Sequence, residues 1–325
     1  MWLSRFVVVL IVVALCAPAE AQQTKKVPRI GYLSATSPSV NPSRIEGFRQ
    51  GLRDLGYVEG KNIIIEWRYA EGKLDRVEDL AADLVRLKVD VIVTAGPTTT
   101  PVVKKATATI PVVMGYDNDP VGSGFVSSLA HPGGNITGLS ALFPELSGKR
   151  LELLKEILPR LSRVAVLGTS TQPGNAQALK EVELAARALR VQLQYLDVLN
   201  PKDVEIAFRA ASKGRADAVL VLVGPVFNSH RIQVADLAVK NRLPAVYGQP
   251  QYVEDGGLLS YTPNYSDLFR RAATYVDKIL KGAKPADLPV EQPTKFEFII
   301  NLKAAKQIGL MISPNVLARA DKVIK

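Results

Sequence analysis

Short apolar runs alternate with amphipathic helical segments through the first half of the chain. Ile45, Phe48, Leu52 and Leu55 recur at i, i+3, i+7 and i+10, which places them on one helical face. The apolar run at 90–95 is nearly continuous, as expected of a strand that is buried on both faces. The strand-type runs cover residues 27–34, 62–69, 90–95 and 111–115. Four alternations of strand and helix predict a parallel sheet with right-handed crossovers.

The same alternation begins again in the second half. The run D-A-V-L-V-L-V-G at 217–224 echoes D-V-I-V-T-A-G at 90–96, and L-P-A-V-Y-G at 243–248 echoes I-P-V-V-M-G at 110–115. The period is on the order of 130 residues, far longer than the repeats of solenoid proteins. The pattern therefore predicts a duplicated α/β architecture with two doubly wound parallel-sheet lobes.

The stretch 116–140 separates the two halves. Asp117 and Asp119 follow a strand-type run, and Pro120 restricts the backbone directly after them. Polar atoms are therefore expected at the carboxyl edge of a sheet, which is where open α/β sheets bind ligands.

Two motifs in this stretch carry a family resemblance. D-P-V-G-S-G-F-V at 119–126 and P-G-G-N-I-T-G at 132–138 resemble a pattern of the ABC transporter substrate-binding proteins that include the tryptophan- and tyrosine-binding lipoproteins. Further fitting segments are R-I-G-Y-L-S at 29–34, G-F-R-Q-G-L-R-D-L-G-Y-V-E-G-K-N-I at 47–63 and F-I-I-N-L-K-A-A-K-Q-I-G-L at 298–310. The resemblance covers nearly all of residues 27–325. It implies the type I periplasmic binding fold, a Venus-flytrap of two lobes joined by a three-strand hinge.

In that fold the chain passes three times between the lobes. We place the crossings near 141–143, 256–258 and 284–292. Lobe one would then contain residues 22–141 plus 257–284, and lobe two residues 142–256 plus 285–325.

Residues 1–21 have the features of a cleaved signal peptide. Arg5 precedes an apolar run at 6–17, and Ala19-Glu20-Ala21 fits the small-x-small cleavage rule. The run is shorter than the roughly 20 residues that span a bilayer. Lipidation at Cys16 is the alternative, but Leu15 stands where lipoprotein signals have a small residue. We therefore expect a periplasmic protein whose mature chain has no cysteine.

The net charge of +10 raises the question of nucleic-acid binding. Basic residues alternate with acidic ones, and no run exceeds two adjacent basic residues. This pattern is typical of a solvated surface, so we expect no nucleic-acid partner. A basic surface also favours anionic ligands or an anionic membrane surface.

Six strand ends are expected to line one cleft between the lobes. Each precedes a helix whose free N–H groups attract anions, carboxylates included. Any one of these polar residues is explained equally well as a helix cap, whereas the whole set favours binding. The candidates are Ser34, Thr36, Gly96, Thr98, Thr99 and Asp117 in lobe one, and Thr169, Ser170, Pro225, Phe227, Tyr247 and Gln249 in lobe two.

The chemistry of the ligand stays open at this point. Asp117 is the better candidate for a ligand amine, and Asp119 for forming the turn. Four aromatic rings on or near the cleft loops could sandwich a flat or apolar ligand or could pack in the core: Tyr116, Phe227, Tyr247 and Tyr252. In the resembling amino-acid binders a T-D-N loop supplies an Asp for the α-amino group, and here Phe227 stands at that place. An aromatic or apolar acid is therefore an alternative to an α-amino acid.

The chain contains no recognisable catalytic or metal-binding pattern. Gly122-Ser123-Gly124 lacks the third glycine of a nucleotide-binding loop, and His131 and His230 have no partner at metal-ligand spacing. We expect a monomeric solute-binding protein without enzymatic activity or cofactor, which delivers a small molecule to an ABC permease in the inner membrane. A sensor subunit that presents the solute to a membrane receptor or kinase is the alternative.

Overall fold

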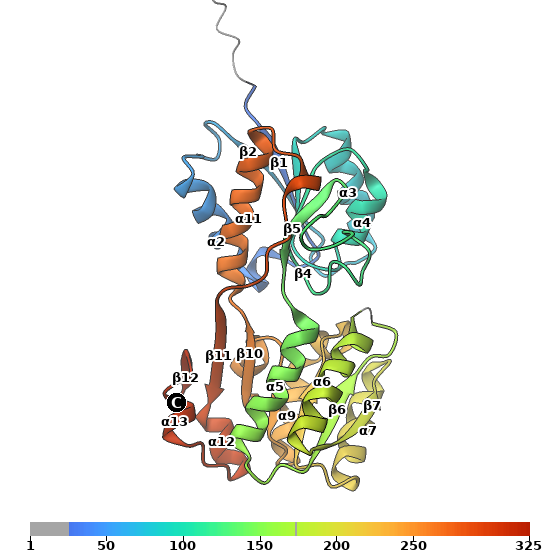
Figure 1. The fold of residues 1–325 in the computed structure, drawn as a ribbon, viewed down its shortest axis with the longest axis vertical. Helices are drawn as coiled ribbons and strands as arrows, with labels where there is room; N and C mark the ends of the chain where they lie inside the picture. The colour runs from blue at the N-terminus through green and yellow to red at the C-terminus, as the bar shows by residue number, and fades with distance from the viewer. Residues whose placement is uncertain (1–25, 173) are drawn as a thin grey trace, which may run out of the picture.

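The computed structural model describes residues 26–172 and 174–325. The expected signal peptide, residues 1–21, lies outside the described residues. Within them the chain forms two α/β lobes, each built on its own sheet (Figure 1). No helix in this part of the chain combines the length and the apolar character that crossing a membrane requires.

The sheet of lobe one is entirely parallel and has the strand order β2-β1-β3-β4-β5. Its strands are β1 (Arg29–Ser34), β2 (Ile64–Tyr69), β3 (Val91–Thr94), β4 (Val112–Asp117) and β5 (Ile136–Ser140). The helices that belong to it are η2 (Pro38–Val40), α2 (Pro42–Asp54), α3 (Arg76–Arg86), α4 (Thr100–Ala106) and α11 (Tyr265–Leu280). The helices α2 and α11 lie together on one side of the sheet, and α3 and α4 on the other (Figure 1).

Helix α11 reaches lobe one from far along the sequence and packs closely on α2. Phe48 and Leu52 of α2 share one core with Leu268 and Ala272 of α11. Gly51 permits this approach, because a Cβ there would lie 2.3 Å from the carbonyl oxygen of Arg270. The first lobe is therefore completed only by residues from the last fifth of the chain.

The sheet of lobe two has the order β12-β11-β10-β9-β8-β6-β7, with β10 and β11 antiparallel and the other neighbours parallel. Its strands are β6 (Arg163–Gly168), β7 (Gln192–Asp197), β8 (Ala218–Val221), β9 (Ala245–Tyr247), β10 (Leu259–Pro263), β11 (Phe296–Asn301) and β12 (Lys322–Ile324). Its helices are α5 (Phe143–Ile157), α6 (Asn175–Leu189), α7 (Pro201–Lys213), α8 (Pro225–Ser229), α9 (Arg231–Lys240), α10 (Gln251–Glu254), α12 (Leu302–Ile308) and α13 (Pro314–Leu317). Leu151 and Val182 represent the core under α5 and α6, and Phe208 and Val234 the core under α7 and α9.

The first crossing between the lobes lies between β5 and α5, where Leu142 adopts a left-handed conformation with φ 49°. The second lies later than the expected 256–258. Strand β10 pairs with β9 and β11 of lobe two, so the chain crosses at Asn264, between β10 and α11. Gly256 and Gly257, within the expected stretch, lie in the turn that leads into β10.

The third crossing falls at the end of the expected stretch. The Thr137 hydroxyl donates to the carbonyl of Leu288 (2.6 Å), and the Glu291 N–H donates to the carbonyl of Gly138 (3.0 Å). These bonds hold residues 285–291, which include η3 (Pro285–Asp287), on lobe one, although we expected them in lobe two. The Asn264 N–H donates to the carbonyl of Lys295 (2.9 Å), so the second and third crossings run side by side.

Candidate ligand-binding site

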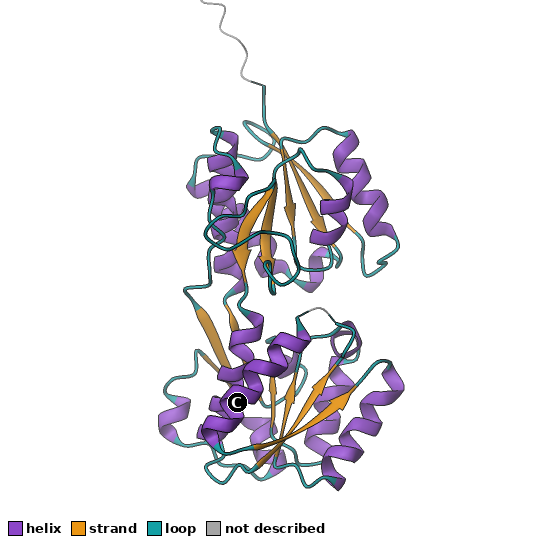
Figure 2. Cartoon of the chain, turned by 45° about the vertical axis from the view of Figure 1, so that its right-hand side comes forward, coloured by secondary structure: helices purple, strands orange, loops and turns teal. Residues whose placement is uncertain are grey.

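The carboxyl ends of the parallel strands lie toward the opposite lobe in both halves of the molecule (Figure 2). The connectivity requires this arrangement. Strand β5 leads at its carboxyl end into α5 of lobe two, and β10, parallel to β9, leads at its carboxyl end into α11 of lobe one. The loops at these strand ends are therefore placed between the lobes, as the fold rule for open α/β sheets anticipates.

The predicted loops of lobe one are mostly held by their own hydrogen bonds. Ser34 is buried, and its Oγ accepts from the N–H of Thr36 (3.2 Å). The hydroxyl of Thr99 is also buried and donates to the carbonyl of Gly96 (2.9 Å). Thr98 is exposed. Thr36 and Thr98 are thus the side chains of this set that remain open to a ligand.

Asp117 lies at the end of β4 and is fully buried. Its Oδ1 accepts from the N–H of Asp119 (3.2 Å), and its Oδ2 has no partner among the described residues. Burial raises the pKa of this carboxyl from 3.8 to about 7. Asp119 in turn accepts from the N–H of Gly122 (2.8 Å), which fits the expected role in the turn. In this conformation the Asp117 carboxyl is closed off from the cleft.

The small polar residues of lobe two also serve the loops in which they lie. Thr169 donates through Oγ1 to the carbonyl of Val198 (2.8 Å). Ser170 donates through its hydroxyl (2.7 Å) and its N–H (2.8 Å) to the two carboxylate oxygens of Asp197. Pro225 is exposed and Gln249 is half-buried. Ser170 is exposed as well, so Ser170, Pro225 and Gln249 are the accessible positions of the lobe-two set.

Phe227 and Tyr247 do not lie on the surface of the cleft. Both side chains are fully buried in the core under α7 and α9, and Tyr247 stacks on Tyr252 with ring centroids 4.7 Å apart. Both rings therefore have the core packing that was considered as the alternative, and their contact with a ligand stays a prediction. Tyr247 is the last residue of β9 and Phe227 lies in α8, and both side chains point into the core.

Sequence reasoning missed Arg44, a buried arginine near the cleft side of lobe one. Arg44 is 8% exposed and lies near the start of α2. Its Nη1 donates to the hydroxyl of Tyr116 (3.3 Å), and its Cζ lies 4.2 Å from the centroid of the Tyr265 ring. Gly96 is part of the same cluster, because a Cβ there would lie 2.8 Å from the Tyr116 hydroxyl oxygen. Arg44 is therefore at the carboxyl edge of the first sheet.

Arg150 of α5 occupies a comparable position in lobe two and was also missed. It is 1% exposed, with Nε donating to the carbonyl of Tyr261 (2.9 Å) and Nη1 to the hydroxyl of Ser147 (3.2 Å). A Cβ on Gly248, directly after β9, would lie 3.3 Å from its Cζ and its Nη2. Burial lowers the pKa of this guanidinium to about 10.

Periodicity could have found both arginines. Arg44 precedes Phe48 by four residues, and Arg150 precedes Leu154 by four, so each lies on the buried face of its helix. A charged residue on such a face is rare unless it has a partner or a function.

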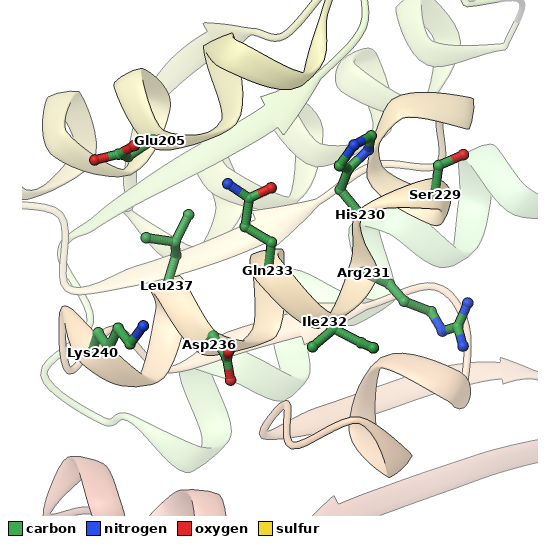
Figure 3. A pocket seen from close by; sticks show the side chains of 9 residues that line it. All are labelled: Glu205, Ser229, His230, Arg231, Ile232, Gln233, Asp236, Leu237 and Lys240. Carbon is green, nitrogen blue, oxygen red and sulfur yellow. The ribbon is translucent and has the colours of Figure 1, made fainter.

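A hollow of about 720 Å³ on lobe two is distinct from this cleft (Figure 3). Glu205 of α7 and Gln233 and Asp236 of α9 line it, together with His230. Most of its side chains are exposed, and the His230 ring bonds to the carbonyl of Val226 (3.0 Å) in its own helical turn. Among residues 26–172 and 174–325, no group of three His, Cys, Asp or Glu side chains is arranged to hold a metal ion.

Known proteins are similar to nearly the whole chain. A tyrosine-binding protein of Clostridioides difficile is 26% identical over 288 residues, which cover 88% of this chain and 82% of that protein. A conserved domain protein of Vibrio cholerae has a TM-score of 0.83 at 29% identity, covering 92% of this chain and all (100%) of its own. An ABC domain from Streptococcus pneumonia in complex with L-Trp has a TM-score of 0.82 at 26% identity, and the similarity covers 91% of this chain and 99% of that chain.

The fold is that of type I periplasmic binding proteins, as the sequence motifs implied. Residues 36–324 match the family described as ABC transporter substrate binding protein. The match spans both lobes and all three crossings. The chain therefore belongs to the ABC transporter substrate-binding protein family.

Proposed function

We propose that this protein is the extracytoplasmic solute-binding component of an ABC importer, and that it carries a small molecule between its two lobes to a permease in the inner membrane. The observation that carries the proposal is the arrangement of the three crossings, which join two lobes whose strand ends lie toward each other. A ligand that touches both lobes favours the closed form, and the permease recognises that form.

Members of this family and fold bind solutes, and the proposed role requires no covalent step. The relatives that bind tyrosine and L-Trp favour an amino acid, or an aromatic or apolar acid, as the ligand here. The predicted contact residues that remain at least partly accessible are Thr36, Thr98, Ser170, Pro225 and Gln249. The protein acts as a monomer in the periplasm after removal of its signal peptide.

Mass spectrometry of the purified mature protein tests this role. Under native conditions the protein is expected to carry a small molecule that is lost when the protein unfolds. After the ligand has been removed, amino acids and aromatic acids are screened by thermal shift, since a ligand that binds only the folded protein raises its melting temperature. A protein without bound solute, and without a shift across the screen, would contradict the proposed role.

A further inference from the structure

Two buried arginines, one in each lobe, have no carboxylate partner among the described residues. The side-chain bond of Arg44 goes to the hydroxyl of Tyr116, and those of Arg150 go to a backbone carbonyl and to the hydroxyl of Ser147. The ion pairs of the described chain involve other, more exposed arginines and lysines, such as Arg53 with Glu46. A buried charge without a counter-ion is costly, so its presence calls for an explanation.

Both guanidinium groups retain unused hydrogen-bond donors. A guanidinium has five N–H donors, and these bonds use one on Arg44 and two on Arg150. Aromatic rings cover part of each group: Tyr265 lies 4.2 Å from the Cζ of Arg44, and Phe143 lies 5.0 Å from the Cζ of Arg150. The remaining donors suit a planar anion, because carboxylates accept two parallel N–H bonds from a guanidinium.

The two arginines lie near the same side of the hinge. Arg44 contacts Tyr116 at the end of β4, and Arg150 lies against Gly248 at the end of β9. Tyr265 follows the second crossing directly, and it is close enough to both guanidinium groups for each to influence its pKa. Each lobe therefore places one positive charge at the carboxyl edge of its sheet, beside the connection on which the lobes pivot.

We propose that Arg44 and Arg150 bind the carboxylate of the transported molecule from opposite lobes. This inference rests on the proposed function and names the residues that bind the acid group of the ligand. Without an anion, two like charges oppose closure of the lobes; a carboxylate between them reverses the sign of that interaction. The anionic group thus contributes differential affinity for the closed form, which is what a ligand must supply to shift the population.

Three matched probes separate the carboxylate from the rest of the ligand. L-Tyrosine has a carboxylate and an amine, desaminotyrosine has only the carboxylate, and tyramine has only the amine. Isothermal titration of the mature, ligand-free protein is expected to show binding of a carboxylate-bearing probe and none of tyramine. Tyramine that binds as tightly as the acids would overturn the inference.

Substitutions then assign the carboxylate to the two arginines. Arg44→Met and Arg150→Met are each expected to weaken binding of the acid by roughly 30-fold or more, the scale for loss of one partner of a buried charged contact. Arg150→Lys, which keeps the charge, is expected to recover part of the loss. Arg53→Met on α2 and Lys149→Met on α5 remove exposed charges from the same helices and are expected to leave the dissociation constant unchanged.

Stability distinguishes a binding role from a structural one. Arg44 makes one long hydrogen bond, and its aromatic contacts can be kept by the apolar side chain of methionine. Because the substitution also removes a buried charge, Arg44→Met is expected to leave the melting temperature of the ligand-free protein unchanged or higher while affinity for the acid falls. A lower melting temperature together with unchanged affinity for the acid would overturn the inference.

The co-purified molecule separates failure of this inference from failure of the proposed function. If native mass spectrometry identifies a solute with an acid group, the inference is supported even where the three probes do not bind. If the solute has no acid group, the inference fails and the proposed function stands. If no solute accompanies the protein and no probe binds, both fail.

Discussion

Replacement of Asp117 by asparagine is expected to change how stability depends on pH. The carboxyl is fully buried, and burial raises its pKa from 3.8 to about 7. Between pH 3.8 and about 7 the Asp117 carboxyl has lost its proton in the unfolded chain but keeps it in the folded chain. A raised folded-state pKa therefore gives stability that is present below pH ~4 and is lost as pH rises toward ~7.

The size of the effect follows from the shift. Each pKa unit corresponds to 1.36 kcal/mol, so a shift of about three units costs the wild type roughly 4 kcal/mol of unfolding free energy between the acidic and the neutral limit. The amide of the Asp117→Asn variant would keep an oxygen that accepts from the Asp119 N–H, but it would not titrate. The stability of Asp117→Asn relative to wild type should therefore rise by up to about 4 kcal/mol from pH 4 to pH 8.

Equilibrium urea unfolding measures this difference. Trp67 in β2 is the only tryptophan outside the expected signal peptide, so its fluorescence reports on lobe one, where Asp117 also lies. Asp83 provides a control whose effect on stability depends on pH with the opposite sign. Hydrogen bonds from Arg68 and Arg86 lower the pKa of its carboxyl, so its contribution to the free energy of unfolding is lost as pH falls. A free-energy difference between Asp117→Asn and wild type that stays constant from pH 4 to pH 8 would refute the reasoning.

Two further substitutions test the connections near the hinge. Gly138→Ala in β5 is expected to lower the unfolding free energy by about 2 kcal/mol or more, because Gly138 has φ +131° and a Cβ would lie 2.3 Å from the Met114 carbonyl oxygen. Gly134→Ala is the matched control in the same urea titration, because a Cβ at Gly134 would meet nothing within 4 Å. Tyr275→Phe removes the hydroxyl that donates to the Pro289 carbonyl (2.5 Å) and is expected to lower the melting temperature by an amount equivalent to about 1 kcal/mol. An unchanged melting temperature would show that this bond does not hold the third crossing.

Hydrophobic periodicity predicted most of the architecture. The nearly continuous run at 90–95 became β3, buried on both faces, and the stripe of Phe48 and Leu52 became the core-facing side of α2. Local pattern could not place the second crossing. Leu259–Pro263 joins lobe two through parallel pairing with β9 and antiparallel pairing with β11, which follows only after α11 in the sequence. Such pairing leaves no signal in a single short segment.

The candidate site was predicted less well than the fold. Strand ends were identified correctly as the cleft-facing edges, but the direction of a side chain there depends on the exact register. Tyr247, at the end of β9, points into the core for that reason, whereas Phe227 reaches the core from helix α8. The strand-end rule could not identify Arg44 and Arg150, because they lie on helices and not in the loops that follow the strands. Their buried environment arises only when α2 meets α11 and α5 covers β9.

Closure of the two lobes on a solute is the central claim, and small-angle X-ray scattering tests it directly. The mature protein is measured after removal of its ligand, and again with the co-purified solute restored at saturation. A decrease in the radius of gyration on binding is predicted, because contacts to both lobes favour the closed form. An unchanged radius of gyration in the saturated protein would contradict the account.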